Sequence, residues 1–397
     1  MLMHMKTTLK LTLLLAAVTA CLTSSAAVAD KSFPGTVRLN QATDISFRNE
    51  IQRAIDKGLA SLTATQNSNG WWSTPDHPSV SGLALSALLG DPDKRYKKDP
   101  RTQKGLDFLL TCAKPDGSIY HTNLINYNTS LSMMALLAAN QPKYDPVLRK
   151  ARAYLAGTQV DMGEPGKTDS PFDGGVGYGS KYAHSDMNNT LVAIEAMYYS
   201  RHLAEDKNLP ETKDLNWQAV ATFIQNCQNL PSHNKQDWVS NDPKHQGGFI
   251  YYPGTSMAGS ETNAAGKVAL RSYGSISYGG LLSYIYADVK KTDPRVVAVL
   301  EWLRANYTLE ENPGMGPQGY YYYLHLMTKA LNAYGAEILE LKDGKKINWR
   351  KDVAMRLINL QKADGSWTND NGRWWEKDPA LVTAYAVMSL EIIYRGM

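Results

Sequence analysis

Strong net charge, long apolar runs and low-complexity stretches are all missing from this 397-residue chain. Its 42 basic and 38 acidic side chains give a formal charge of only +4, so composition predicts no nucleic-acid partner. The longest apolar run, residues 11–20, is about half the length of a membrane-spanning helix. Hydrophobic residues nevertheless make up 43% of the chain, which excludes a disordered protein and favours a large buried core.

The N-terminal 29 residues are typical of a secretion signal, because a short basic segment precedes the apolar run and small residues follow it. Two processing sites remain open. Residues 27–29 have the small-x-small form of a signal peptidase site, whereas residues 18–21 resemble a lipoprotein box in which Cys21 would carry a lipid anchor. Both predict an extracytoplasmic protein, periplasmic or secreted, whose one membrane contact would be that anchor. Residues 30–45 are then an N-terminal extension.

One spacing recurs along residues 46–397, the part of the chain that we expect to fold as one domain. An apolar pair is followed by Gln and then by Gly-x-Trp, and degenerate copies complete a set of six. The residues that carry the motif are Leu62, Gln66, Gly70 and Trp72; Leu155 and Gln159; and Leu357, Gln361, Gly365 and Trp367. The repeat glycines are expected at Gly70, Gly117, Gly175, Gly247, Gly319 and Gly365.

Each repeat has an apolar-periodic segment before the Gln position and another after the Gly-x-aromatic turn, which predicts twelve helices. The leading helices are expected near residues 46–65, 99–113, 143–159, 215–228, 293–307 and 347–361. The trailing helices are expected near residues 79–89, 127–139, 186–203, 274–288, 321–335 and 379–394. One helical hairpin cannot bury its own apolar face, so the hairpins must stack, and the apolar sixth repeat favours closure onto the first.

Cys112 and Cys227 both stand directly before the Gln position, in the second and fourth repeats. A closed ring of six places these positions about a third of a turn apart, well beyond the ~7 Å that a disulfide can span between Cα atoms. No intramolecular disulfide is therefore expected.

The Gln-Gly-Trp spacing resembles the QW motif, and the chain is similar to the prenyltransferase and squalene-oxidase repeat family over residues 46–394. The resemblance implies an all-α fold, an α6/α6 toroid of six helical hairpins in which trailing helices line a central cavity. It also implies that the repeat Gln and Trp residues tie one hairpin to the next. It also implies an isoprenoid-like or ring-containing ligand. Three chemistries of such toroids lack their key residues here: the Asp-x-Asp-Asp acid of class II terpene cyclases, the Asp-x-Cys zinc ligands of protein prenyltransferases and the Gly-Cys-Gly-Glu-Gln thioester sequence. No cofactor and no metal site are predicted.

Polar and aromatic residues that precede or begin the trailing helices are the candidate site. Candidates for catalysis are Glu376, Asp378, His325, Tyr322, Glu310 and Glu311, because Tyr, His and carboxylates together can transfer protons. Candidates for ligand binding are Trp374, Trp375, Tyr321, Tyr323, His184 and Asp186. Capping by Asp186 and Asp378, and packing of the aromatic residues, are the structural alternatives.

Three functions remain open from the sequence. The first is an exported toroid that holds a small-molecule ligand in an aromatic and acidic cavity. The second is a polysaccharide lyase or hydrolase that uses the Tyr, His and Glu residues. The third is a non-catalytic scaffold that binds partners through its rim loops, of which residues 229–268 form the longest. The oligomeric state is not predicted.

Overall fold

The computed structural model describes residues 45–179, 184–204, 213–262 and 266–397. By internal contacts the chain divides into two units, residues 1–34 and 35–397, and every described residue lies in the second. The signal segment, Cys21 and nearly all of the N-terminal extension lie outside the described residues. None of the helices within the described ranges combines the length and hydrophobicity that crossing a bilayer requires.

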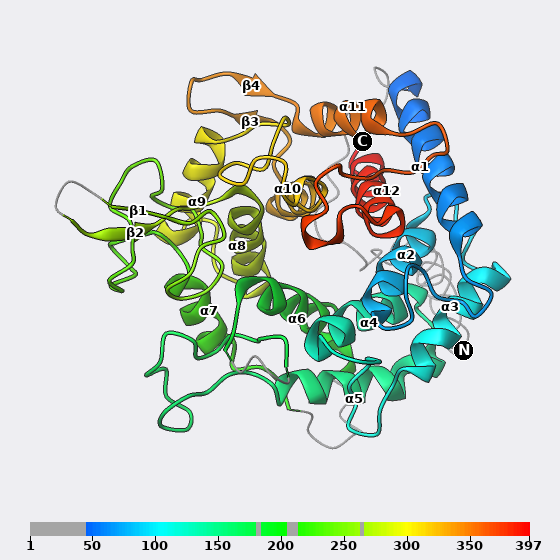
Figure 1. Ribbon diagram of the computed structural model, residues 1–397, viewed down its shortest axis with the longest axis horizontal. Coiled ribbons are helices and arrows are strands. Elements are labelled where there is room, and N and C mark those ends of the chain that lie inside the picture. Colours follow the sequence, from blue (N-terminus) through cyan, green and yellow to red (C-terminus); the bar gives the residue numbers. More distant parts are fainter. Residues whose placement is uncertain (1–44, 180–183, 205–212, 263–265) are drawn as a thin grey trace, which may run out of the picture. The chain divides into compact units, whose positions relative to one another are not determined.

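Twelve α-helices in the described part of the chain form two concentric rings (Figure 1). The outer helices are α1 (Ile45–Thr65), α3 (Pro100–Thr111), α5 (Asp145–Ala156), α7 (Trp217–Asn226), α9 (Pro294–Ala305) and α11 (Trp349–Leu360). The inner helices are α2 (Pro78–Gly90), α4 (Ile125–Ala139), α6 (Met187–Tyr199), α8 (Gly274–Tyr286), α10 (Tyr320–Tyr334) and α12 (Pro379–Arg395). These bounds confirm the predicted helices to within a few residues at each end.

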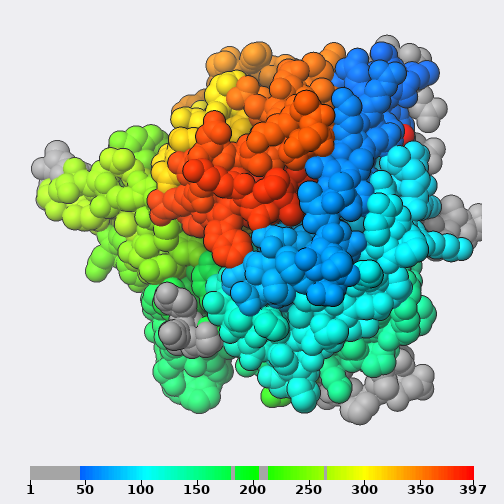
Figure 2. Space-filling model, turned by 45° about the vertical axis from the view of Figure 1, so that its right-hand side comes forward, coloured from blue at the N-terminus to red at the C-terminus, as the bar shows by residue number. Residues whose placement is uncertain are grey.

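The inner ring is closed. Each inner helix packs against the next one in sequence, and α12 packs against both α1 and α2. Figure 2 shows the last helices, in red and orange, lying directly against the first, in blue. The expected α6/α6 toroid is therefore confirmed.

The two rings differ in burial, as their sequences require. Inner helices such as α2, α8 and α12 are buried at most positions, and their sequences are apolar all round. Outer helices expose a polar face; α5, for example, buries only Leu148, Ala151, Arg152 and Leu155. Small strands lie outside the rings: β1 (Ser260–Thr262) pairs with β2 (Val268–Leu270), and β3 (Leu339–Glu340) pairs with β4 (Lys346–Ile347).

The repeat glutamines join neighbouring hairpins. The Gln66 side-chain amide donates to the Gly70 carbonyl in its own turn and to the Arg101 carbonyl at the start of α3, both at 2.9 Å. Gln361 donates in the same way to the Gly365 carbonyl at 3.0 Å and to the Ala54 carbonyl of α1 at 2.9 Å. Gly70 and Gly365 lie in turns outside the helices, and these bonds give their carbonyl groups a partner. The last glutamine therefore links the sixth hairpin to the first.

The repeat tryptophans fill the same junctions. Trp72 and Trp367 are fully buried, and each indole N–H donates to the carbonyl of an outer helix, that of Leu62 at 2.7 Å and that of Leu357 at 2.8 Å. The Trp367 ring lies so close to Gly58 of α1 that a Cβ atom there would be 2.9 Å from it. The expected packing of these residues is confirmed.

Two expected repeat glycines are wrong. In the third repeat the glycine with positive φ is Gly174 rather than Gly175; Gln159 donates to its carbonyl at 2.9 Å. In the fifth repeat Gly319 directly precedes α10 and lies against Trp374, so it does not form the turn that the other repeats share. The fifth repeat has Tyr307 at the glutamine position. It therefore lacks the side-chain amide that binds the glycine carbonyl of the turn in the first, third and sixth repeats.

Cys112 and Cys227 are free thiols, and both are buried. Among the long loops, the 229–268 segment carries β1 and part of the hairpin that β1 forms with β2. Figure 1 places this hairpin at the outer edge, far from the inner helices.

Candidate functional site

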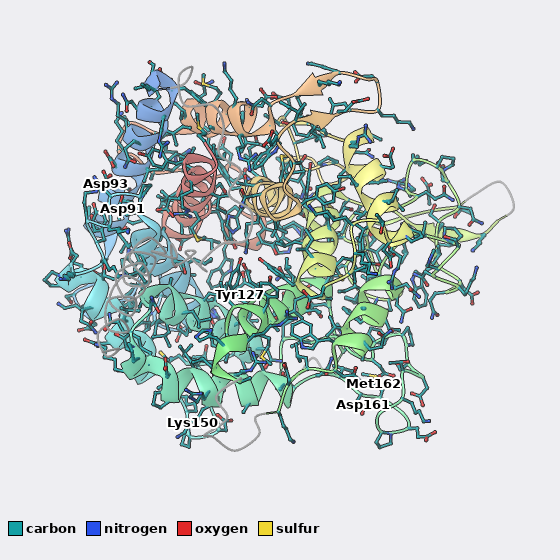
Figure 3. The ribbon with its side chains drawn as sticks, turned by 180° about the vertical axis from the view of Figure 1, so that it is seen from behind. Asp91, Asp93, Tyr127, Lys150, Asp161 and Met162 are labelled. Atoms are coloured by element: carbon teal, nitrogen blue, oxygen red, sulfur yellow. The ribbon has the colours of Figure 1, made fainter. Side chains whose placement is uncertain are left out.

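Five tyrosines gather at the N-terminal ends of the inner helices. We call Tyr127, Tyr178, Tyr251, Tyr322 and Tyr385 the tyrosine cluster. Tyr127, Tyr322 and Tyr385 lie in α4, α10 and α12, and the other two lie in the segments that precede α6 and α8. Figure 3 shows Tyr127 in the middle of the ring of inner helices.

Hydroxyl groups of the tyrosine cluster contact one another and a neighbouring amide. The Tyr127 and Tyr385 hydroxyls are 3.5 Å apart, and those of Tyr178 and Tyr251 are 3.1 Å apart. The Tyr322 hydroxyl donates to the Asn188 side chain. The centroid of the Tyr322 ring lies 5.6 Å from that of the Tyr385 ring. Tyr385 is buried, and the other four tyrosines are half-buried, so each of those four keeps some accessible surface.

An apolar surface continues inward from the tyrosine cluster. Residues at i, i+4 and i+7 share one face of α4, and residues at i, i+3 and i+7 share one face of α12. Because Tyr127 and Tyr385 meet across the ring interior, these two faces front each other. The residues that follow the tyrosines on them are Leu131 and Met134 in α4, and Met388 and Ile392 in α12. Leu131 and Ile392 each keep 7% of their surface accessible, and the two methionines keep more.

On the opposite side, α6 and α10 meet across α8. The ring side of α8 carries Gly279, where an added Cβ would be 3.4 Å from Leu191 of α6 and 3.6 Å from Leu326 of α10. Deeper in the ring, Lys329 of α10 forms an ion pair with Glu195 of α6 at 2.5 Å. Leucines and an ion pair therefore occupy the interior beside α8, and Met134 of α4 and Met388 of α12 keep part of their surface accessible.

Burial sets the protonation state of the site. It raises the pKa of Tyr127 to about 12, and it raises that of Tyr322 and Tyr385 well above the ordinary value, so these hydroxyls stay neutral at pH 7. Burial and the charge of Lys329 hold the pKa of His325 well below its ordinary value. This imidazole is neutral at pH 7; it stacks on Tyr385 with ring centroids 5.1 Å apart and contacts the Ser389 hydroxyl at 3.3 Å.

Asp186 is a predicted carboxylate that lies beside the tyrosine cluster. It caps α6: one oxygen accepts from the Asn189 backbone N–H at 2.9 Å and the other from the Asn189 side chain at 2.8 Å. Burial raises the pKa of Asp186 to about 6, although these hydrogen bonds lower it. Burial and then the charge of Asp186 raise the pKa of Tyr178 and Tyr251. His184 lies close by, with its ring 4.5 Å from that of Tyr252.

The acidic candidates outside this region do not form a shared site. Glu310 is 75% exposed and pairs with Arg356 of α11 at 3.0 Å, and Glu311 is exposed as well. Both were expected at the mouth of the ring. The ion pair with Arg356 holds Glu310 against α11 instead.

Two further carboxylates cap inner helices. Asp378 accepts from the backbone N–H groups of Ala380 and Leu381 at the start of α12. Glu376 is buried and accepts from the Tyr322 N–H at 2.8 Å, in the first turn of α10. Gly319 cannot cap α10 with a side chain of its own, and Glu376 supplies that acceptor from the loop before α12. The structure favours capping over catalysis for both.

The remaining aromatic candidates divide between core and surface. Tyr321 and Tyr323 are buried, and the Tyr323 hydroxyl donates to the Thr308 carbonyl at 2.8 Å, so both pack away from the tyrosine cluster. Trp374 and Trp375 are exposed at the rim. Of the twelve predicted site residues, Tyr322 belongs to the tyrosine cluster, and His325, Asp186 and Glu376 lie beside it.

Sequence reasoning missed Tyr127, Tyr178, Tyr251 and Tyr385. The sequence did mark two of them. Tyr127 and Tyr385 are large side chains with a polar hydroxyl, in trailing helices that consist mostly of small and aliphatic residues. Tyr178 and Tyr251 lie in loops without periodicity, so nothing in the sequence indicated where they would point.

One group of three acidic residues in the described ranges brings its oxygens close enough to share an ion: Asp56, Asp91 and Asp93. The Arg95 guanidinium already pairs with Asp56 at 2.5 Å and with Asp91 at 2.8 Å, which satisfies these carboxylates. Figure 3 shows Asp91 and Asp93 at the outer edge, far from Tyr127. This group is therefore an ion-pair cluster on the outside of the barrel.

Comparison with known proteins supports the fold. Neither a family model nor a curated protein sequence matches the chain. Among solved structures, the type II terpene cyclase MstE from Scytonema, without ligand, is similar with a TM-score of 0.53 and 13% identity over 88% of this chain and 99% of that chain. A variant of that cyclase in complex with its substrate, geranylgeranyl dihydroxybenzoate, has a TM-score of 0.50, 13% identity and the same coverage. A possible GH105 family member from Salmonella enterica has a TM-score of 0.49 and 13% identity over 90% of this chain and 96% of that chain. The chain thus has the fold of the terpenoid cyclase-like toroids.

Proposed function

We propose that this chain is an exported member of the prenyltransferase and squalene-oxidase repeat family that binds an amphipathic, isoprenoid-like ligand inside the inner ring. The observation that carries the proposal is the order of side chains on α4 and α12: tyrosine hydroxyls at the mouth, then leucine, isoleucine and methionine further in. A hydroxylated or ring-bearing end would contact the tyrosine cluster, and an apolar tail would lie against Leu131, Met134, Met388 and Ile392.

The junction contacts support the family assignment. Gln66 and Gln361 each join the turn of one hairpin to the outer helix of the next, which is the structural role that the resemblance implies for the motif. The leader segment, residues 1–29, supports export. The similarity to MstE, which binds geranylgeranyl dihydroxybenzoate, gives a starting point for the choice of probe.

A binding experiment with geranylgeraniol tests the proposal. Calorimetry on the purified mature chain should give saturable binding. Met134→Trp, which fills the apolar interior, should abolish it, and Tyr127→Phe should weaken it about 2- to 10-fold through the loss of one hydrogen bond. Tyr96→Phe, outside the ring, serves as the control. Binding that Met134→Trp leaves unchanged would place the ligand elsewhere, and no binding of any isoprenoid alcohol would exclude the ligand class.

A second candidate function, an enzyme that cleaves polysaccharides, rests on Asp186. Its carboxyl group, with a pKa of about 6 and the Tyr178 and Tyr251 hydroxyls nearby, can accept and return a proton near neutral pH. Release of reducing ends or of unsaturated uronic acids from a polysaccharide panel, lost in Asp186→Asn, would support this function. A folded wild-type protein that is inactive on the whole panel would exclude it.

A further inference from the structure

Two adjacent tryptophans at the rim adopt a backbone conformation that large side chains rarely take. Trp374 and Trp375 have φ angles of 54° and 65°, in the left-handed region that favours glycine. Their side chains are also 44% and 46% exposed, so burial of the indoles does not offset the strain. Strained residues that gain little packing are concentrated at functional positions.

The loop that carries the two indoles is rigidly held. We call residues 366–378 the rim loop. The Asn369 N–H donates to the Glu376 carbonyl at 2.7 Å, which closes the loop, and the Asn369 side chain donates to the Pro317 carbonyl at 2.7 Å. Arg373 donates to the Gln318 side chain at 2.6 Å, which ties the loop to the segment before α10. The indoles are therefore presented in fixed positions.

Each indole is also oriented by a neighbour. The Arg373 guanidinium lies over the Trp374 ring, 4.7 Å from its centroid, and Trp374 rests on Gly319 before α10. Trp375 meets the edge of His77, the residue before α2, with ring centroids 4.6 Å apart. The pair thus spans the rim between the inner helices on either side of α12.

A polar cavity of about 450 Å³ is formed by the same loop together with the turn after α11 and the start of α12. Its hydrogen-bonding side chains include Asp364 and Asp370, Lys362 and Lys377, and Ser366 and Asn369. Two carboxylates and two ammonium groups balance, so the cavity has no preference for a charged ligand, and it offers many donors and acceptors to hydroxyl groups.

We propose that the rim loop is a carbohydrate-binding site for a neutral polysaccharide, separate from the ligand site inside the ring. Flat faces of pyranose rings stack on indoles, and 44% of Trp374 and 46% of Trp375 stay accessible beside Arg373 and His77. The polar cavity formed by the same loop would accept the hydroxyl groups of another sugar unit. A lipid surface fits less well, because Asp364 and Asp370 would be brought to the membrane together with the indoles. The inference does not depend on what binds inside the ring.

Affinity electrophoresis in gels that contain glucomannan, and separately hydroxyethylcellulose, tests the site. The wild-type chain should be retarded by at least one of these neutral β-linked polysaccharides. Trp374→Gly and Trp375→Gly should each weaken the retardation at least tenfold, and Asp370→Asn should weaken it less. Ile338→Ala, which removes an exposed apolar side chain away from the rim loop, should behave as wild type.

Melting temperatures separate binding from folding. Glycine adopts positive φ without strain, so both glycine variants should melt at or above the wild-type temperature. Variants that lose retardation together with several degrees of melting temperature would mean that the indoles are structural. Absence of retardation in both gels, equal retardation of the variants and wild type, or co-sedimentation with anionic vesicles that depends on the two indoles would each overturn the proposal.

Discussion

Single side chains at the hairpin junctions have the largest expected effect on stability. Trp72 and Trp367 are fully buried, donate an indole hydrogen bond and rest against glycines of the next outer helix. The glycine on the far side of each indole has no side chain that could refill the space.

Trp367→Ala should therefore lower the free energy of unfolding by about 3–5 kcal/mol, the usual range for a large-to-small change in a core. Urea denaturation followed by circular dichroism measures the change. Trp217→Ala, on the half-buried surface of α7, is the control and should have a much smaller effect. A Trp367→Ala variant as stable as the parent would show that the repeat tryptophan does not fill the junction.

Glu376 was predicted as a catalytic residue, but in the structure it caps the N-terminus of α10. Its oxygens accept from the Tyr322 N–H and from the Asn369 side chain at 2.6 Å. In Glu376→Gln one of these donors would face an amide NH₂ group, so the variant should lose about 1–2 kcal/mol of stability. Thermal melting tests this. Unchanged melting combined with loss of ligand binding would restore the functional role that the sequence suggested.

At the scale of the element, the turns between paired helices depend on close approach of two backbones. Gly365 has a φ of 83°, and a Cβ atom there would overlap the Lys57 carbonyl oxygen of α1. Gly70 and Gly117 meet the Lys104 and Lys150 carbonyls in the same way. The turn glycine is thus required both for its φ angle and for contact between hairpins.

A pair of variants separates these two requirements. Gly344 has nearly the same φ, 82°, but no atom lies within 4 Å of the position that its Cβ would take. Gly344→Ala should cost about 1 kcal/mol through backbone strain alone, whereas Gly365→Ala should cost at least about 2 kcal/mol more. Chemical denaturation of both variants gives the difference. Equal losses would mean that the close approach contributes nothing.

At the scale of the whole ring, closure brings a carboxyl group into the seam between the last and first inner helices. Glu391 of α12 is buried against Gly90 of α2, and burial raises its pKa well above the ordinary value. The charge of nearby Arg395 opposes this shift, and that of Asp91 adds to it. The group is therefore protonated in the folded protein at a pH where it is ionised in the unfolded chain.

The sign of the pH dependence follows. A raised pKa in the folded state contributes stability that is present below the ordinary pKa of a glutamate and is lost as the pH rises through the folded value, by up to about 1.4 kcal/mol per pH unit. Glu391→Gln should remove this slope from the stability profile between pH 4 and pH 8, and Glu50→Gln, on the exposed face of α1, should keep it. An identical slope in Glu391→Gln would show that other groups control it.

The sequence predicts the fold of this protein better than it predicts the site. Helix positions, the turn at Gly365 and the junction role of Gln66 could be predicted, because they depend on spacings within one repeat that recur along the chain. Of the exceptions, Gly319 falls in a repeat where the motif is degenerate, whereas Gly174 is the first of two adjacent glycines in the third repeat, and the spacing alone did not decide between them.

The sequence by itself therefore determined the twelve helices, their pairing into six hairpins and the closure of the ring, since a periodic apolar face must be covered by the next copy of itself. Only the tertiary structure decided the site. Tyr127 and Tyr385 are 258 residues apart and meet because α4 and α12 flank α2 in a closed ring. Contact between the rim loop and the start of α10 likewise makes Glu376, which precedes α12, the cap of α10. Both facts arise from contacts between repeats, where no local spacing in the sequence specifies the partner.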